Sequence, residues 1–393
     1  MTNRWVILAL AWLAFLLSYI DRLAWSNAAT SVGHTLNLPL ATLGFFVTAF
    51  YVGYVASNLL GGLASDVMGP RRLLASALLG LGLATFLFGS IATVTQGLIV
   101  QALMGLCAGA DYAIGVKLIA AWFDRRDRGT SMGIFMTATS LGVVITNLIV
   151  PPLLTTLHWN GVYRLLGTIT IAGALLCLAL VRDAPHTTET QPFNFADFMD
   201  LFRDRNLILV AISGFGAMWG TWGFAFWAST LMVRARHLSP VEAGSIVALF
   251  GAGAIVSKPL IGIISDRLGG IHRIPVIACL LSFVAVLLLF GTLETKIQFR
   301  IVAPILGVTA FAYSPLLGAM VTELAGTCRA GSSAGATNAF WQLGSVIVPA
   351  VVGMVFQATQ SFNAAFMTLA AGPLLGACGL MLVAAPQPMQ LNR

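Results

Sequence analysis

Charged side chains stand inside long apolar stretches of this chain, where charge is costly: Asp21, Arg22, Asp111, Lys117 and Lys258. An ionisable group in a membrane-spanning helix costs about 2.5–3.5 kcal/mol on insertion scales, so each one needs a reason. A buried cation can bind an anion, and a buried carboxyl can take up and release a proton. The chemistry that these residue types indicate is therefore the binding of an anion together with the movement of a proton.

Asp21 and Arg22 are adjacent, so on a helix they point about 100° apart and cannot both face lipid at low cost. They are either a structural pair with neighbouring spans or an anion-binding arginine beside a proton-carrying carboxyl. Asp111 is a second candidate proton carrier. Lys117 lies five residues before Trp122, so it either contacts the substrate or reaches the headgroups at the helix end.

Lys258 is the deepest charge in the second half of the sequence. It precedes Asp266 by eight residues, or ~12 Å of helix, which is too deep for its ammonium to reach the headgroups easily. It either pairs with a carboxylate for structural reasons or binds an anion. If Arg22 and Lys258 come from different halves, a cavity between the halves has one cation on each wall.

Other side chains are candidates for the wall of such a cavity. Trp222 lies in an aromatic segment whose members Trp219, Trp222 and Phe226 share a helical face by their spacing, and which could instead contact lipid. Amides within an apolar span require hydrogen-bond partners. The remaining candidates for substrate contact are Tyr54, Asn338, Trp341 and Gln342.

The composition is that of a membrane protein. Hydrophobic residues make up 58% of the 393 residues and charged residues 9%, whereas a soluble domain carries roughly 25% charged residues. The net charge is +7, but the basic residues lie mostly in the predicted loops between spans, so nucleic acid is not a predicted partner. The predicted partners are the lipid bilayer, protons and a small organic anion. The scattered cysteines and histidines lack metal spacing, and no phosphate-binding glycine loop is present, so no metal, cofactor or enzyme activity is expected.

Hydrophobicity divides the chain into two groups of six predicted spans, each near the ~20 residues that a membrane requires. We predict an all-α membrane protein with two pseudo-symmetric six-helix bundles at residues 1–182 and 207–393, joined by a polar cytoplasmic linker at 183–206. The predicted spans are roughly 5–32, 40–65, 71–91, 95–122, 129–152, 162–182, 207–233, 241–265, 273–292, 297–324, 331–357 and 362–384.

Basic residues set the predicted orientation, because cytoplasmic loops are enriched in lysine and arginine. With the N-terminus inside, loops that contain Arg71, Arg125 and Arg267 all fall in the cytoplasm. An even number of spans then places the C-terminus inside as well. The expected location is the inner (plasma) membrane of a bacterium, and the expected state is a monomer.

A short loop sequence occurs in both halves. Gly62-Leu63-Ala64-Ser65-Asp66-Val67-Met68-Gly69, followed by Arg71, matches Gly262-Ile263-Ile264-Ser265-Asp266-Arg267-Leu268-Gly269 at four positions. A repeat at half the chain length indicates two halves of similar design. The loop resembles the signature of the major facilitator superfamily, which implies that Gly62, Asp66, Gly69, Arg71 and Asp266 act in conformational change.

The first predicted span resembles one branch of that superfamily. Ser18-Tyr19-Ile20-Asp21-Arg22 is similar to the first span of the anion:cation symporters of that superfamily, in which the arginine contacts an organic anion and the aspartate takes part in proton coupling. The same branch usually has an arginine where this chain has Gln101 and a glutamate where it has Ala108. Asp111, about one turn beyond Ala108, is the expected replacement for that glutamate.

The surroundings of Lys258, Ser257-Lys258-Pro259-Leu260-Ile261-Gly262, resemble span eight of the monocarboxylate and oxalate carriers, which have a substrate-binding arginine there. These resemblances imply proton-coupled symport of a small organic anion, in particular a carboxylate, by alternating access. An anion exchanger of the same fold and a non-transporting nutrient receptor are the alternatives.

Overall fold

The computed structural model describes residues 4–123, 125–182, 204–267, 272–325 and 330–383, and within them every element of regular structure is an α-helix. The helices are α1 (Arg4–Thr35), α2 (Leu40–Met68), α3 (Pro70–Phe88), α4 (Val94–Ala108), α5 (Asp111–Trp122), α6 (Arg125–Leu180), α8 (Arg205–Arg236), α9 (Pro240–Arg267), α10 (Arg273–Thr292), α11 (Lys296–Ala325), α12 (Ala330–Thr359) and α13 (Phe362–Met381).

Two departures from simple spans are visible in this order. The predicted fourth span consists of α4 and α5, which are interrupted at Gly109 and Ala110, and the predicted fifth and sixth spans are joined as α6 across a kink at His158. Among the described residues, nine helices are long and apolar enough to cross a membrane. The exposed leucines, isoleucines and phenylalanines on their outer faces match a lipid environment.

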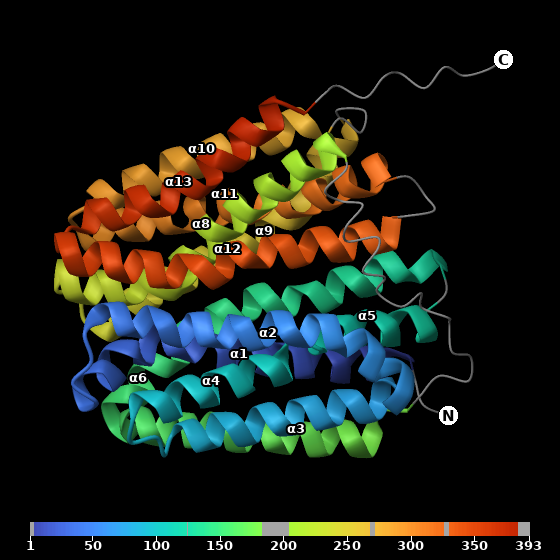
Figure 1. Ribbon diagram of the computed structural model, residues 1–393, viewed down its shortest axis with the longest axis horizontal. Coiled ribbons are helices and arrows are strands. Elements are labelled where there is room, and N and C mark those ends of the chain that lie inside the picture. Colours follow the sequence, from blue (N-terminus) through green and yellow to red (C-terminus); the bar gives the residue numbers. More distant parts are fainter. Residues whose placement is uncertain (1–3, 124, 183–203, 268–271, 326–329, 384–393) are drawn as a thin grey trace.

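Helices α1–α6 and α8–α13 form two sets that lie side by side (Figure 1). In the first set α1 packs on α6 and α3 on α6, and in the second α8 packs on α12 and α13. Contacts between the sets run mainly through α2 with α12, α6 with α9, and α1 with α8. The beginning of α1 and the end of α13 lie at the same end of the molecule (Figure 1).

The local structure of the first set recurs in the second. At the start of α4, Gln96 N donates to Thr93 Oγ1 and Gln96 Oε1 accepts from Ala92 N. At the start of α11, Gln298 N donates to Thr295 Oγ1 and Gln298 Oε1 accepts from Glu294 N, so the same pattern recurs. Positive φ at Asn37 and His158 recurs at His237 and Gln360, roughly 200 residues further along.

The same repetition appears at the starts of α3 and α10. Arg71 Nη2 donates to the carbonyl of Leu178 at 2.8 Å, and Arg273 Nε donates to that of Leu380 at 3.0 Å. The repeat that the sequence predicted from its loops therefore extends to caps, turns and arginine contacts.

Candidate functional site

Arg22 lies at the middle of α1, with 4% of its surface exposed, and aromatic rings surround it. Its guanidinium carbon is 4.5 Å from the ring centre of Trp222 and 5.7 Å from that of Phe50. Because the face of an aromatic ring carries negative charge, such rings stabilise a cation. We call this group the aromatic cage; its members are Tyr19, Phe50, Tyr51, Tyr54 and Trp222.

One hydrogen bond orients the guanidinium within the cage. Nη2 of Arg22 donates to the hydroxyl of Tyr51, whereas its buried Nε has no hydrogen-bond partner. A planar guanidinium presents donors in a fork that matches a carboxylate. The cage therefore holds a positive charge that rings and one hydroxyl surround, with one buried donor, Nε, that has no hydrogen-bond partner.

The cage lies where the two sets of helices meet. Trp222 comes from α8, and its ring centre is 5.9 Å from that of Tyr19 on α1. One turn further along α8, the ring of Phe226 meets that of Tyr51 on α2 edge-on at 5.8 Å. A ligand at Arg22 would thus contact both sets.

Asp21 points away from the cage. Thr85 Oγ1 of α3 donates to its Oδ2 at 3.0 Å, and Thr170 of α6 faces the same carboxyl. The residue is 1% exposed and lies inside the first set of helices. The adjacent pair is therefore divided, with the cation facing the interface and the carboxyl facing α3 and α6.

Asp111 is the first residue of α5 and is also 1% exposed. Ser18 of α1 faces its carboxyl, but neither oxygen forms a hydrogen bond with a described residue. A buried ionised carboxylate without donors is costly, and a bound proton removes that charge. Asp21, on α1, and Asp111, at the start of α5, both lie buried within the first set of helices.

Five residues form a hydrogen-bonded group across the interface, nearer the turn between α1 and α2. Asn27 Nδ2 donates to Asn147 Oδ1 of α6 at 3.0 Å, and Ser229 Oγ of α8 donates to Asn27 Oδ1 at 3.1 Å. Thr230 of α8 donates to the carbonyl of Ser26 at 3.3 Å. This outer cluster, made of Ser26, Asn27, Asn147, Ser229 and Thr230, joins the two sets one to two turns beyond Arg22.

The three predicted substrate contacts on α12, which are Asn338, Trp341 and Gln342, are not members of the aromatic cage. Trp341 donates from Nε1 to the carbonyl of Val210 at 3.3 Å and packs on Gly214, so it holds α12 to α8. Gln342 is buried, and its Oε1 has no hydrogen-bond partner. Asn338 is half-buried. Gln342 therefore remains a candidate polar contact, whereas Trp341 has a packing role.

The three aromatic side chains that were predicted to share one face of α8 contact different helices. Trp222 and Phe226 turn toward the first set, but Trp219 Nε1 donates to the carbonyl of Thr368 on α13 at 2.9 Å. Three-residue spacing corresponds to 300° of rotation, so neighbouring helices can separate two such side chains.

The remaining predicted residues lie in helices or turns. Lys117 is half-buried on α5, and Gly69 ends α2 with φ at 76°, a conformation that suits glycine. The side chains of Asp66, Lys258 and Asp266, and Gly62 with them, lie outside the described residues. Across the described part of the chain, no group of three or more His, Cys, Asp or Glu side chains could hold a metal ion.

No pattern in the sequence indicated that Tyr19, Phe50, Thr85 or the outer cluster belongs to the site. Tyr19 lies three residues before Arg22, which places it on the same helical face. Asn27 and Asn147 are amides within apolar spans, the same signal that indicated Asn338 and Gln342. Their partners come from distant parts of the chain, and no spacing in the sequence connects them.

Comparison with known families gives a match over most of the chain. The sequence profile described as Major Facilitator Superfamily matches residues 10–349. The chain is 25% identical to the Probable galactarate/D-glucarate transporter GudP of Bacillus subtilis, over 98% of this chain and 92% of that protein. It is 26% identical to the Probable sulfoacetate transporter SauU of Cupriavidus necator, over 95% and 92%.

Solved structures share the fold. A bacterial homologue of the human lysosomal transporter Spinster, inward-facing and occupied, superposes with a TM-score of 0.81 at 14% identity, over 97% of this chain and 96% of that one. A D-xylose-proton symporter superposes with a TM-score of 0.76 at 16% identity, over 96% and 97%. At such low identity these similarities establish the fold and not the substrate.

Proposed function

The chain belongs to the Major Facilitator Superfamily and is an integral membrane transporter, not an enzyme, and from this membership we propose that it takes up a small organic anion by proton-coupled symport. The observation that carries the proposal is Arg22, a buried cation in an aromatic cage between two sets of helices. Two relatives are named as probable transporters of galactarate and D-glucarate and of sulfoacetate, which are all organic anions.

The proposed architecture has twelve spans in two six-helix bundles, residues 1–182 and 207–393, with a linker at 183–206 and both termini in the cytoplasm. The recurring caps and arginine contacts support two equivalent halves. In alternating access the bundles rock about the central site and expose it to one side at a time. The proposed location is a bacterial inner membrane, and the proposed state is a monomer.

Arg22 would bind the carboxylate, with Tyr54, Trp222 and Gln342 enclosing the rest of the anion. Lys258 of α9 and Lys117 of α5 are proposed as further cations toward the substrate. Asn338 and Trp341 of α12 are proposed as further substrate contacts. The rings around the guanidinium carry no net charge, so they leave its positive charge to attract a bound anion. The loop residues Gly62, Asp66, Gly69, Arg71 and Asp266 are proposed to act in the change of conformation.

Asp21 and Asp111 are the proposed proton carriers. Asp21 is buried on α1, the helix that holds Arg22, and Asp111 is buried against that helix, so protonation of either carboxyl can alter the position of α1. Thr85 donates to the carboxyl of Asp21, whereas neither carboxyl oxygen of Asp111 forms a hydrogen bond with a described residue, although Ser18 faces it. This difference suggests that the two carboxyls take part in different steps.

Transport in proteoliposomes tests the function. Asp21→Asn should abolish uphill uptake on a proton gradient but keep the exchange of internal for external anion, and Asp111→Asn is measured in parallel. D-Glucarate and sulfoacetate are the first anions to test. If both variants still accumulate substrate on a proton gradient, symport through these carboxyls is wrong. If the unaltered protein exchanges anions but never accumulates them, the protein is an exchanger.

A further inference from the structure

Two buried polar atoms on α12 have no hydrogen-bond partner among the described residues: Oε1 of Gln342 and Oγ of Ser345. The two residues are three positions apart, so they lie on the same side of the helix. A buried polar group that lacks a partner costs free energy, and most such groups in proteins are paired. Gln342 is a proposed substrate contact, but nothing so far accounts for Ser345, which has no exposed surface.

Ser345 faces the hydroxyl of Tyr51 across the interface between α12 and α2. The neighbouring contact of the same two helices is a hydrogen bond, in which Thr48 Oγ1 donates to the carbonyl of Val346 at 2.8 Å. Tyr51 follows Thr48 by about one turn, and Ser345 directly precedes Val346. The hydrogen bond of Thr48 therefore fixes the two helices at a register that places Ser345 opposite the phenol.

The hydroxyl of Tyr51 already accepts a hydrogen bond from Nη2 of Arg22. A phenol also has one hydrogen of its own to donate. Because Tyr51 is fully buried, that hydrogen requires an acceptor inside the protein. The unpartnered Oγ of Ser345 faces it, so a small approach of α12 to α2 would complete a chain of hydrogen bonds from Arg22 through Tyr51 to Ser345.

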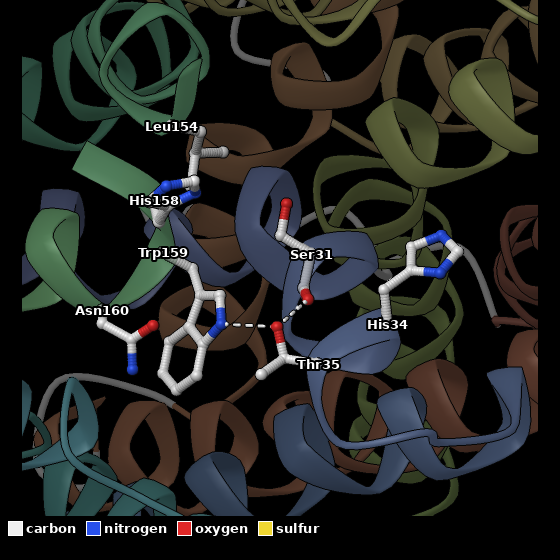
Figure 2. A pocket seen from close by; sticks show the side chains of 7 residues that line it. All are labelled: Ser31, His34, Thr35, Leu154, His158, Trp159 and Asn160. Carbon is white, nitrogen blue, oxygen red and sulfur yellow. Dashed lines mark hydrogen bonds between the residues drawn. The ribbon is translucent and has the colours of Figure 1, made fainter. Parts of the chain in front are cut away.

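The backbone of α1, by contrast, is held within the first set of helices. At its outer end, beside the kink of α6 at His158 (φ 51°, ψ 172°), Trp159 Nε1 donates to Thr35 Oγ1 at 3.0 Å (Figure 2). Near the middle of α1, Asp21 is bound by α3. The position of α1 thus depends on the first set, whereas the hydroxyl that orients its guanidinium faces Ser345 of the second set.

We propose that Ser345 is a positioning residue for the anion site. Its hydroxyl receives the hydrogen of the Tyr51 phenol, and that phenol holds the guanidinium of Arg22 with its free Nε in one direction. The second set of helices therefore controls how the first set presents its cation, and the guanidinium is fully oriented only while α12 is closed on α2. The inference rests on the proposed function for the claim that Arg22 binds an anion.

The hydrogen on Nε of Arg22 tests the role of Ser345 without any ligand. In protein that is labelled with nitrogen-15 arginine and placed in lipid nanodiscs, the Nε–H signal that disappears in Arg22→Lys identifies this group. Its exchange with solvent is measured in Ser345→Ala and in Tyr51→Phe, which keeps the ring. We expect each change to accelerate the exchange about threefold or more, because each removes one hydrogen bond from the chain that orients the guanidinium. In the Tyr51→Phe background, Ser345→Ala should have no further effect.

Thr48→Val is the matched control, because Thr48 joins the same helix pair but donates to a backbone carbonyl and not to the phenol. It should leave the exchange at Arg22 unchanged. Equal acceleration in Thr48→Val and Ser345→Ala would mean that α2 is only loosened from α12, and it would overturn the proposal. So would an unchanged rate in Ser345→Ala, an additive effect in the Tyr51→Phe background, or the absence of an Arg22 signal from the unaltered protein.

Calorimetry separates this inference from the proposed function. Ser345→Ala should weaken the binding of D-glucarate or sulfoacetate about threefold or more, and Thr48→Val should not. Unchanged affinity in Ser345→Ala would overturn the positioning role. If the unaltered protein binds neither anion, the proposed class of ligand is wrong, and the exchange rates alone decide the role of Ser345.

Discussion

At the scale of single residues, the shape of the guanidinium of Arg22 matters as much as its charge. Rings lie on several sides of it, and Nη2 donates to Tyr51. A lysine would place a point charge in this space without the planar fork. The arrangement explains how a charge can be stable in the middle of a span before any anion is bound.

Arg22→Lys should therefore lose most uptake although the formal charge is kept. We expect substrate binding to weaken by about 1.4 kcal/mol or more, a tenfold change, because a bidentate contact is lost. Calorimetry with the transported anion measures the binding, and Arg300→Lys, at an exposed position on α11, is the matched control. Unchanged affinity in Arg22→Lys would contradict the role of the fork.

Replacement of His158 is predicted to raise stability. Glycine accepts φ near 51° without a Cβ clash, so His158→Gly should raise the free energy of unfolding by about 1–3 kcal/mol. His237 also has positive φ, but with ψ at 28° it lies in the ordinary left-handed region that ends many helices. His237→Gly should have a smaller effect. Thermal unfolding in detergent compares the two, and equal shifts would show that His158 is not specially strained.

At the scale of helices, glycines determine how closely α2 approaches α4 and how closely α9 approaches α11. A Cβ at Gly105 would lie 1.7 Å from the carbonyl oxygen of Phe50, and one at Gly307 would lie 1.9 Å from that of Phe250. Backbone atoms cannot move aside as a side chain does. The same contact in both halves indicates that close packing of these helix pairs is part of the repeated design.

Gly105→Ala should therefore destabilise the protein by about 1–3 kcal/mol through overpacking. Gly307→Ala should behave alike, because it occupies the equivalent place in the second set. Gly133→Ala is the control, since nothing lies within 4 Å of a Cβ built there. The measurement is the melting temperature of each purified variant. Equal stability of Gly105→Ala and Gly133→Ala would show that α2 and α4 adjust their distance easily.

At the scale of the whole molecule, the pattern of apolar segments predicted the helices well because each span must satisfy its own backbone hydrogen bonds. Patterns could not show that the fourth span breaks at Gly109 or that a kink at His158 joins two spans as α6. Such details depend on packing between helices that are distant in sequence.

The candidate site was only partly predictable for the same reason. The cost of burying charge identified Arg22, Asp21 and Asp111 from sequence alone. That Asp21 turns to Thr85 while Arg22 turns to Trp222 depends on which helices meet α1 on each side. A side chain's direction around a helix is predictable relative to its neighbours in sequence, but the helix that it meets is not.

The two sets of helices contact each other closely on one side of the aromatic cage. The outer cluster links α1 to α8, and Thr48 of α2 donates to the carbonyl of Val346 on α12 at 2.8 Å. A Cβ at Gly44 would lie 2.3 Å from the carbonyl oxygen of Pro349, so α2 and α12 also approach closely there. If the bundles rock, these contacts must break before an anion can pass from the outer side to Arg22.

Cross-linking across the outer cluster should therefore stop transport. In a variant without the native cysteines, Asn27→Cys with Ser229→Cys joins α1 to α8, whereas Asn27→Cys with Asn147→Cys joins α1 to α6 within one bundle. Both pairs replace side chains that are hydrogen-bonded to each other. Oxidation should reduce uptake in proteoliposomes at least about tenfold for the first pair, with recovery after reduction, because a covalent link prevents the bundles from separating. The second pair should keep its uptake after oxidation. Full uptake by the oxidised Asn27–Ser229 pair, with the cross-link verified by mass spectrometry, would mean that the anion reaches Arg22 without separation of α1 from α8.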